Sequence, residues 1–144
     1  MTVVRPERTG WRDENISRRH REWGWNCPAV DLDFVMVEYH LGKPIGLIEY
    51  KHYHARMPNF QHPTYRALGE LANSAGLAFI LAFYWPEIWA FHVRPLNKMA
   101  AKHFDPNQVL TERQFVMTLY QMRELKMESA LEKVLNDQLP AKAG

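Results

Sequence analysis

The chain has 144 residues, of which 47% are hydrophobic and 24% charged, and its formal net charge is +2. This balance is ordinary for one globular domain with one core, and the near-neutral charge excludes a polycation that coats DNA. No apolar run reaches the roughly 18–20 residues that span a bilayer, so no membrane association is expected. A charged N-terminus argues against a signal peptide, and the single Cys27 excludes an internal disulfide, so the expected compartment is the cytoplasm.

The N-terminal segment is rich in basic residues although the chain as a whole is nearly neutral. Six arginines, Arg18 and Arg19 among them, lie within the first twenty-one residues. Such a segment fits phosphate contacts at one edge of the protein, and it equally fits the solvated face of a helix. Residues 1–12 contain a proline and show no periodicity, so we expect them to be poorly ordered. A short helix should follow, reaching to about Trp23.

The segment from residue 29 to residue 52 predicts two strands joined by a turn. Residues 29–39 form an extended run, residues 40–44 contain a glycine and a proline, and residues 45–52 are again largely apolar. Apolar side chains at the four consecutive positions 34–37 favour a first strand that is covered on both faces. The pattern therefore predicts a β-hairpin within a buried sheet.

The rest of the chain continues the alternation of helices and strands. We expect a helix over 65–75, a second hairpin from strands 77–85 and 88–96, a short helix over 97–104, and a C-terminal helical part 111–139. Within that part, a capping box begins a helix that runs to about residue 127. We therefore expect a single domain over residues 13–139. Its fold class is α/β (α+β), with a central mixed β-sheet of about four strands flanked by helices.

Ionisable side chains gather on the predicted first hairpin. Asp31 and Asp33 lie on its first strand. On its second strand, Glu49 and Lys51 share one face while Tyr50 points to the other, because side chains alternate along a strand. Ionisable groups in an apolar sheet cost free energy unless something pairs them. A divalent cation held by the carboxylates would offset this cost, and oxygen ligands favour Mg²⁺ or Mn²⁺ over Zn²⁺.

This arrangement resembles the PD-(D/E)xK (restriction endonuclease-like) nuclease superfamily, in particular its small single-domain members from phage and mobile elements. The matching residues are Asp33 and the Glu49–Lys51 triplet, with fifteen residues between Asp33 and Glu49. The resemblance implies a core of order α-β-β-α-β-β-α in a bacterial or phage-infected host cell. It also implies that Asp33 and Glu49 hold the metal together with the backbone carbonyl of Tyr50. Lys51 would then orient the attacking water and stabilise charge on the phosphate.

Two features of the predicted site depend on geometry that the sequence leaves open. The motif's Pro-Asp pair is absent, because Pro28 precedes Asp31 by three residues, so either Asp31 or Asp33 is the ligand; we prefer Asp33 because an apolar pair follows it. Asp33 and Glu49 share a sheet face only in one of the two classes of hairpin register. A three-residue turn or a bulge at Gly42 would give that register, whereas a four-residue loop without a bulge would not.

Several further residues are candidates for supporting roles. Glu22 and His20 on the first helix could lie beside the metal, although a solvated Glu22 and a packed His20 are the ordinary alternatives. The loop after the second strand could contact nucleic acid, because loops at the end of a rigid sheet often carry binding groups. The candidate nucleic-acid contacts are Arg18, Arg19, His52, His54 and Arg56.

The sequence therefore predicts a metal-dependent endodeoxyribonuclease whose partner is DNA, with RNA left open as a substrate. A homodimer is one expected state, because small domains of the resembled superfamily often pair so that two sites cut two strands. The alternative is a catalytically silent nucleic-acid-binding or assembly protein on the same fold. A small-molecule enzyme is disfavoured, since the sequence has no Gly-rich phosphate loop and no nucleophile motif.

Overall fold

The computed structural model describes residues 14–23 and 29–141, and the chain divides into two compact units, 1–31 and 32–144. The described part of the first unit holds helix α1 (Glu14–Trp23), as the sequence predicted. The expected disorder of residues 1–12 lies outside the described residues. That residues 13–139 form one domain stays a prediction.

The second unit is built on a five-stranded mixed sheet in the order β1-β2-β3-β4-β5. Strands β2 and β3 are parallel, and every other neighbouring pair is antiparallel. An α+β fold with a mixed sheet is therefore confirmed, and the fifth, two-residue strand was not predicted. The strands are β1 (Phe34–Glu38), β2 (Lys43–His52), β3 (Ala78–Trp85), β4 (Ala90–Pro95) and β5 (Val109–Leu110).

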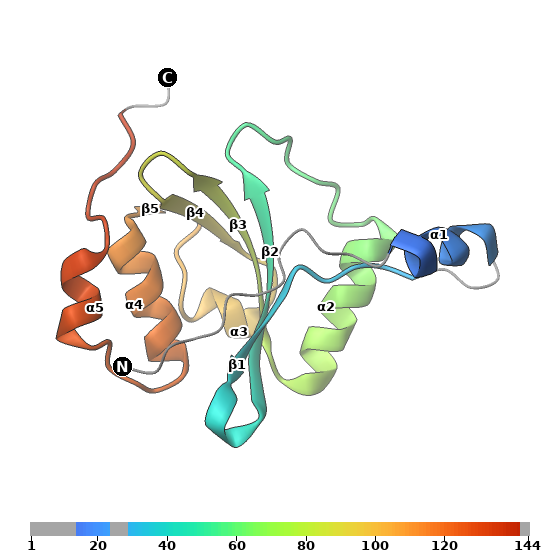
Figure 1. The fold of residues 1–144 in the computed structure, drawn as a ribbon, viewed down its shortest axis with the longest axis horizontal. Helices are drawn as coiled ribbons and strands as arrows, with labels where there is room; N and C mark the ends of the chain where they lie inside the picture. The colour runs from blue at the N-terminus through green and yellow to red at the C-terminus, as the bar shows by residue number, and fades with distance from the viewer. Residues whose placement is uncertain (1–13, 24–28, 142–144) are drawn as a thin grey trace. The chain divides into compact units, whose positions relative to one another are not determined.

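Helices lie on both faces of this sheet (Figure 1). Helix α2 (Pro63–Ala75) connects the parallel strands β2 and β3 and packs on one face. Helices α3 (Lys98–Ala101) and α4 (Glu112–Met122) pack on the other face, and α5 (Ser129–Val134) follows on the side of α4. No helix among the described residues is long and apolar enough to cross a membrane.

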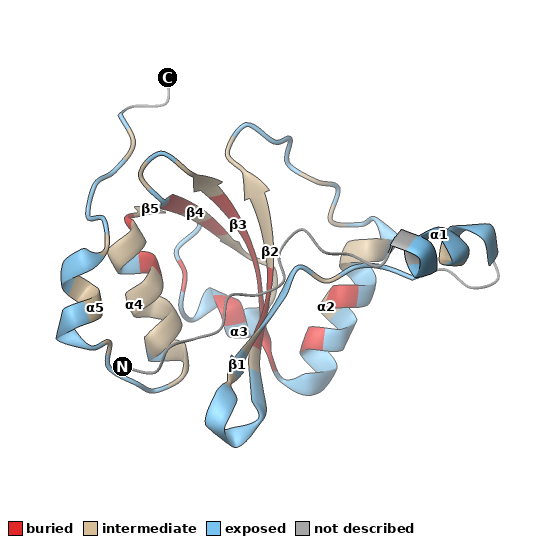
Figure 2. Ribbon diagram, viewed as in Figure 1, coloured by how far each residue is buried: buried red, intermediate tan, exposed pale blue. Residues whose placement is uncertain are grey.

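The hydrophobic core forms two layers, one on each face of the central strands. On the α2 face, Leu47 and Phe79 pack against Leu68 and Ala72 of the helix. On the opposite face, the core includes Phe115 of α4, whose ring stacks on Phe91 at a centroid distance of 4.0 Å. Figure 2 shows the buried segments concentrated on β2, β3 and β4.

Strand β1, by contrast, is an exposed edge of the sheet, so the prediction that it is covered on both faces was wrong. Phe34, Val35 and Val37 are each more than 40% exposed. The physical reason is position: α2 packs on β2 and β3 rather than on β1. The strand is also shorter than predicted, because it begins only at Phe34.

Helix α4 begins as predicted but ends early. The side chain of Thr111 accepts a bond from the Gln114 N–H, and the Gln114 side chain accepts one from the Thr111 N–H, which completes the capping box. The helix ends at Met122, not near residue 127, and Glu124 then has a positive φ of 57°. A second Glu-x-Lys triplet, Glu124–Lys126, therefore lies in a connection and not within a helix.

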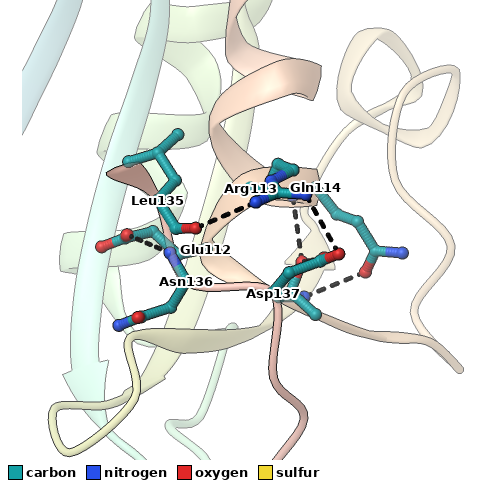
Figure 3. Close-up of polar contacts among 7 residues, drawn as sticks. Glu112, Arg113, Gln114, Leu135, Asn136 and Asp137 are labelled. Atoms are coloured by element: carbon teal, nitrogen blue, oxygen red, sulfur yellow. Dashed lines mark hydrogen bonds and ion pairs between the residues drawn. The ribbon is translucent and has the colours of Figure 1, made fainter. Parts of the chain in front are cut away.

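The segment after α5 returns to the first turn of α4 and binds it through several polar contacts (Figure 3). The Asn136 N–H donates to Glu112 at 2.9 Å, and the Asn136 carbonyl accepts from the Arg113 N–H at 3.0 Å. Asp137 accepts from the Thr111 hydroxyl at 2.9 Å and pairs with the Arg113 guanidinium at 3.3 Å. These contacts, here called the C-terminal clasp, hold α4 where it covers the sheet.

One asparagine connects three elements on the α2 side of the fold. The Asn97 side-chain oxygen accepts from the Phe79 N–H at 3.1 Å and from the Ala100 N–H at 2.9 Å, which caps α3. Its amide donates to the Leu77 carbonyl at 2.8 Å and to the Asn73 side chain at 3.1 Å. The side chain thereby satisfies backbone groups where β3 begins.

Candidate functional site

The register of the β1–β2 hairpin decides whether the two predicted ligands can meet. Glu38 lies opposite Lys43 across a four-residue turn, but Phe34 lies opposite Ile48. The two pairings are reconciled because Ile45 has no partner on β1 and forms a β-bulge. The shift sets Asp33, which immediately precedes β1, level with Glu49. The bulge that the register requires is therefore present, at Ile45 and not at Gly42.

One hydrogen bond joins Asp33 to Glu49, and a second joins Asp33 to Tyr50, the neighbour of Glu49 on β2. The backbone N–H of Asp33 donates to Glu49 Oε1 at 3.2 Å. The backbone N–H of Tyr50 donates to Asp33 Oδ2 at 3.0 Å. Each carboxylate is thus held in place by the backbone of the other strand, and the two acidic side chains form an acid pair at the end of the hairpin.

The acid pair is electrostatically unfavourable when both groups are ionised. Partial burial raises the pKa of Glu49, and the negative charge of Asp33 raises it further. The bond from the Asp33 N–H and the positive charge of Lys51 act in the opposite direction but do not cancel the increase. A bound divalent cation would remove this penalty.

Tyr50 lies between the two site residues of β2 but faces the other side of the sheet, as predicted. Its ring packs edge-on against Phe34 at 5.4 Å and Phe115 at 6.4 Å, and burial raises the pKa of its hydroxyl to about 12. Within a strand, the N–H and C=O of one residue point to the same edge. Since the Tyr50 N–H points to Asp33, its carbonyl is directed to the Asp33 side, where the predicted third ligand would be needed.

Lys51 follows Glu49 on the same face of β2, about 7 Å further along the strand. Its charge is close enough to lower the pKa of Glu49. The structure therefore brings Asp33, Glu49 and Lys51 together on the α2 face, at the carboxyl end of the parallel strand β2. In sheets with βαβ connections, ligands commonly bind at this end.

Tyr65, in the first turn of α2, belongs to the site but was not singled out from the sequence. Burial raises the pKa of its hydroxyl, and the charges of Glu49 and Asp33 raise it further, so the phenol lies within electrostatic range of the acid pair. The crossover from β2 to β3 explains this position, because it brings the N-terminal end of the connecting helix to the carboxyl end of β2.

Arg94 on β4 is a second residue that the sequence analysis missed. Glu49 lies opposite Leu81 of β3, and Leu81 lies opposite Arg94. Residues directly opposite one another share a face, so the Arg94 side chain emerges on the acid-pair face, about 10 Å across the sheet from Glu49. The sequence could have pointed to Arg94, because it is a charged residue that interrupts the apolar run of β4.

The residues predicted to contact nucleic acid at the end of β2 and in the loop after it lie near this end of the sheet, but their side chains do not all point to the acid-pair face. His52 projects to the face opposite Lys51 and contacts Tyr84 at 5.7 Å. His54 stacks on His52 at 5.1 Å, and its backbone N–H donates to His52 Nδ1. Arg56 is exposed in the loop. Their roles in nucleic-acid binding stay predictions.

The remaining predicted residues belong to the N-terminal unit, and their roles at the site also stay predictions. On α1, Arg19 pairs with Glu22 at 3.0 Å while both side chains remain more than half exposed, which fits a solvated helix face. His20 packs edge-on against Trp23 at 4.7 Å. Arg18 is exposed on the same helix, and Asp31 is the last residue of the unit.

The donor set fits a magnesium or manganese ion better than zinc. Two carboxylates and a backbone carbonyl supply hard oxygen ligands, and water would complete the shell of Mg²⁺ or Mn²⁺. Across residues 14–23 and 29–141, no group of three or more His, Cys, Asp or Glu side chains could hold a metal ion. Comparison of the chain with known protein families, curated proteins and solved structures finds no match.

Proposed function

We propose that this chain is a metal-dependent nuclease that hydrolyses phosphodiester bonds in DNA, on a core of the PD-(D/E)xK type. The observation that carries the proposal is the acid pair. Asp33, just before β1, contacts Glu49 on β2, and the pKa of Glu49 is raised even though Lys51 is close. A structural role does not require two carboxylates to be adjacent, whereas a divalent cation does.

Each residue has a distinct role in the proposed reaction. Asp33, Glu49 and the Tyr50 carbonyl would hold Mg²⁺ or Mn²⁺. When bound, the ion would neutralise charge on the phosphoryl oxygens and lower the pKa of a water molecule. Lys51 would donate a hydrogen bond to the phosphate or to the attacking water, where negative charge develops. Tyr65 would orient a phosphate oxygen with its hydroxyl, which its raised pKa keeps protonated.

A catalytically silent DNA-binding or assembly protein is the second candidate. The exposed apolar edge formed by β1 favours it, because such an edge can take up a second chain. That role would not require Glu49 to be ionised beside Asp33. The acid pair therefore favours the nuclease.

The proposal is tested by cleavage of labelled linear, branched and single-stranded DNA with Mg²⁺, Mn²⁺ or EDTA. The site variants are Asp33→Asn, Glu49→Gln and Lys51→Gln. Glu87→Gln is the matched control, because Glu87 is an exposed carboxylate on the β3–β4 turn. We expect metal-dependent cutting that falls at least about 100-fold in the three site variants and stays unchanged in the control.

Binding and folding are measured on the same proteins. Circular dichroism should show native folding, and DNA binding in EDTA should persist in Asp33→Asn and Glu49→Gln. Wild-type protein that binds DNA but cuts no substrate with either metal would contradict the nuclease and support the silent binder.

A further inference from the structure

A pocket of about 270 Å³ lies between the first half of α2 and the strands β3 and β4. Phe60 and Tyr65 line it from the helix side, and Phe79 and Arg94 line it from the sheet. Arg94 emerges on the same sheet face as Glu49, in the same row across β2, β3 and β4. Tyr65 also lines the pocket and lies within electrostatic range of the acid pair. The pocket and the proposed metal site thus lie on the same face of the sheet.

The walls of the pocket suit a flat, apolar group. The rings of Phe60 and Tyr65 meet edge to face, with centroids 5.4 Å apart and planes at 89°, and Phe79 lies below them. Gly69 of α2 also lines the pocket and leaves it open because it has no side chain. Ligand pockets usually hold about 300–1,000 Å³, so this one accepts only a small group such as a single nucleobase.

Arg94 supplies the charge that an anionic ligand needs. It is partly buried, yet its side chain forms no hydrogen bond or ion pair within the described part of the chain. A guanidinium in a concave, partly apolar site favours a phosphate or carboxylate partner, which it can bind with two parallel hydrogen bonds. Aromatic walls and an unpaired guanidinium together match a nucleotide.

We propose that this pocket receives one unpaired nucleotide of the DNA strand that is cut, with the base against Phe60 and Tyr65 and a phosphate on Arg94. This rests on the proposed nuclease function and narrows its substrate class. A base that is stacked within a duplex cannot enter a walled pocket, so the nucleotide must be unpaired before it binds. The preferred substrates are therefore DNA ends, gaps, flaps or bulges, rather than continuous duplex.

Gly69 allows a test that fills the pocket without changing its aromatic residues or Arg94. A Cβ at this position would lie 3.9 Å from the Phe79 ring, which is ordinary van der Waals contact. Gly69→Ala is therefore expected to fold, with a higher melting temperature because alanine favours helix, and to reduce the preference for an unpaired base less than a larger side chain does. Gly69→Leu should extend into the pocket and exclude the base. The pair separates occupation of the pocket from any effect on the helix.

The role of the Arg94 charge is tested with a second pair of variants. Arg94→Gln removes the guanidinium at the pocket. Lys102→Gln removes an exposed positive charge at the end of α3, a helix that packs on the opposite face of the sheet. Phe60→Ala is a further variant in a loop, and it keeps the proposal testable if Gly69→Leu does not fold.

The assay is DNA binding by anisotropy in EDTA, so that its result does not depend on cleavage. One probe is a fully paired duplex, and the other is the same duplex with a single unpaired 2-aminopurine, whose fluorescence falls on stacking. We expect wild type and Lys102→Gln to prefer the unpaired probe about tenfold and to quench it, and Gly69→Ala to keep part of this preference. Gly69→Leu, Arg94→Gln and Phe60→Ala should lose both the preference and the quenching.

The possible failures are distinguishable. Equal binding of the two probes by wild type, or an unchanged preference in both Gly69→Leu and Phe60→Ala, would overturn the pocket assignment even if the protein cuts DNA. A preference that these variants lose, in a protein that never cuts, would support the pocket and refute the nuclease. Competition by free dAMP at the oligonucleotide's own concentration would overturn the assignment to a nucleotide within a strand.

Discussion

Asn97 offers a sharp test of the energetics of this fold, because its four side-chain hydrogen bonds reach three elements. We consider Asn97→Ala. Loss of the bond to the Ala100 N–H removes a helix cap, which costs about 1 kcal/mol. The Phe79 N–H and the Leu77 carbonyl then lose partners in a largely buried setting, at about 1 kcal/mol each. The bond to exposed Asn73 adds little.

The expected destabilisation of Asn97→Ala is therefore about 3 kcal/mol. For a chain of this length, that corresponds to a fall in melting temperature of about 10 °C. Urea denaturation followed by circular dichroism, with an unchanged m-value, measures the change in unfolding free energy. Asn73→Ala is the matched control, because it removes only the fourth bond and should cost below about 0.5 kcal/mol.

Equal effects of the two alanine substitutions would refute this reasoning, since they differ only in the backbone groups left without partners. Asn97→Asp adds a graded test. Its oxygens still accept from the Phe79 and Ala100 N–H groups, but an ionised carboxylate cannot donate to the Leu77 carbonyl. Its stability should therefore fall between wild type and Asn97→Ala at neutral pH.

Three further predictions follow from the charged groups. In EDTA, Glu49→Gln should raise the unfolding free energy at pH 7, because the fold raises the pKa of Glu49 and its ionised form is therefore unfavourable. This gain should vanish as the pH falls to about 4.5 and below, where Glu49 is protonated in both the folded and the unfolded chain. Urea titrations at pH 4 and pH 7 measure the difference. The pKa of Glu38 is lowered mainly by its hydrogen bond to Arg123 at 2.9 Å. This pair should therefore stabilise the protein above about pH 4.5 and lose its effect as the pH falls through the lowered pKa. Glu38→Gln should make the unfolding free energy depend less on pH in this acidic range. Asp137→Ala should lower the unfolding free energy by about 1 kcal/mol and speed amide hydrogen exchange in the first turn of α4. Unchanged hydrogen exchange in that turn would show that the C-terminal clasp does not hold the helix.

The faces of the hairpin were predictable from the sequence because alternation within a strand is a local property. Glu49 and Lys51 share a face and Tyr50 takes the other, as their spacing requires. The capping box at Thr111 and the second hairpin were predictable for the same reason, since each depends on residues close in the chain.

The parts that the sequence could not fix depend on packing between distant segments. The bulge at Ile45 has no Gly or Asn to mark it, so the sequence leaves the register of the hairpin open. The β2–β3 crossover brings Tyr65 within electrostatic range of the acid pair, and the pairing of three strands sets Arg94 on the same sheet face as Glu49. Helix α4 ends without a glycine, because non-glycine Glu124 takes the positive φ.

The hairpin's register has a consequence for the proposed metal site. Its two strands carry apolar side chains on both faces, with Leu47 and Ile48 buried on opposite sides, so a one-residue slip would exchange one aliphatic side chain for another. The same slip would put Asp33 and Glu49 on opposite sides of the sheet. Only local features such as Ile45 and the close approach of Gly46 to Ala78 discriminate between the two alignments. A change to these two residues is therefore expected to separate Asp33 from Glu49 while the protein stays folded.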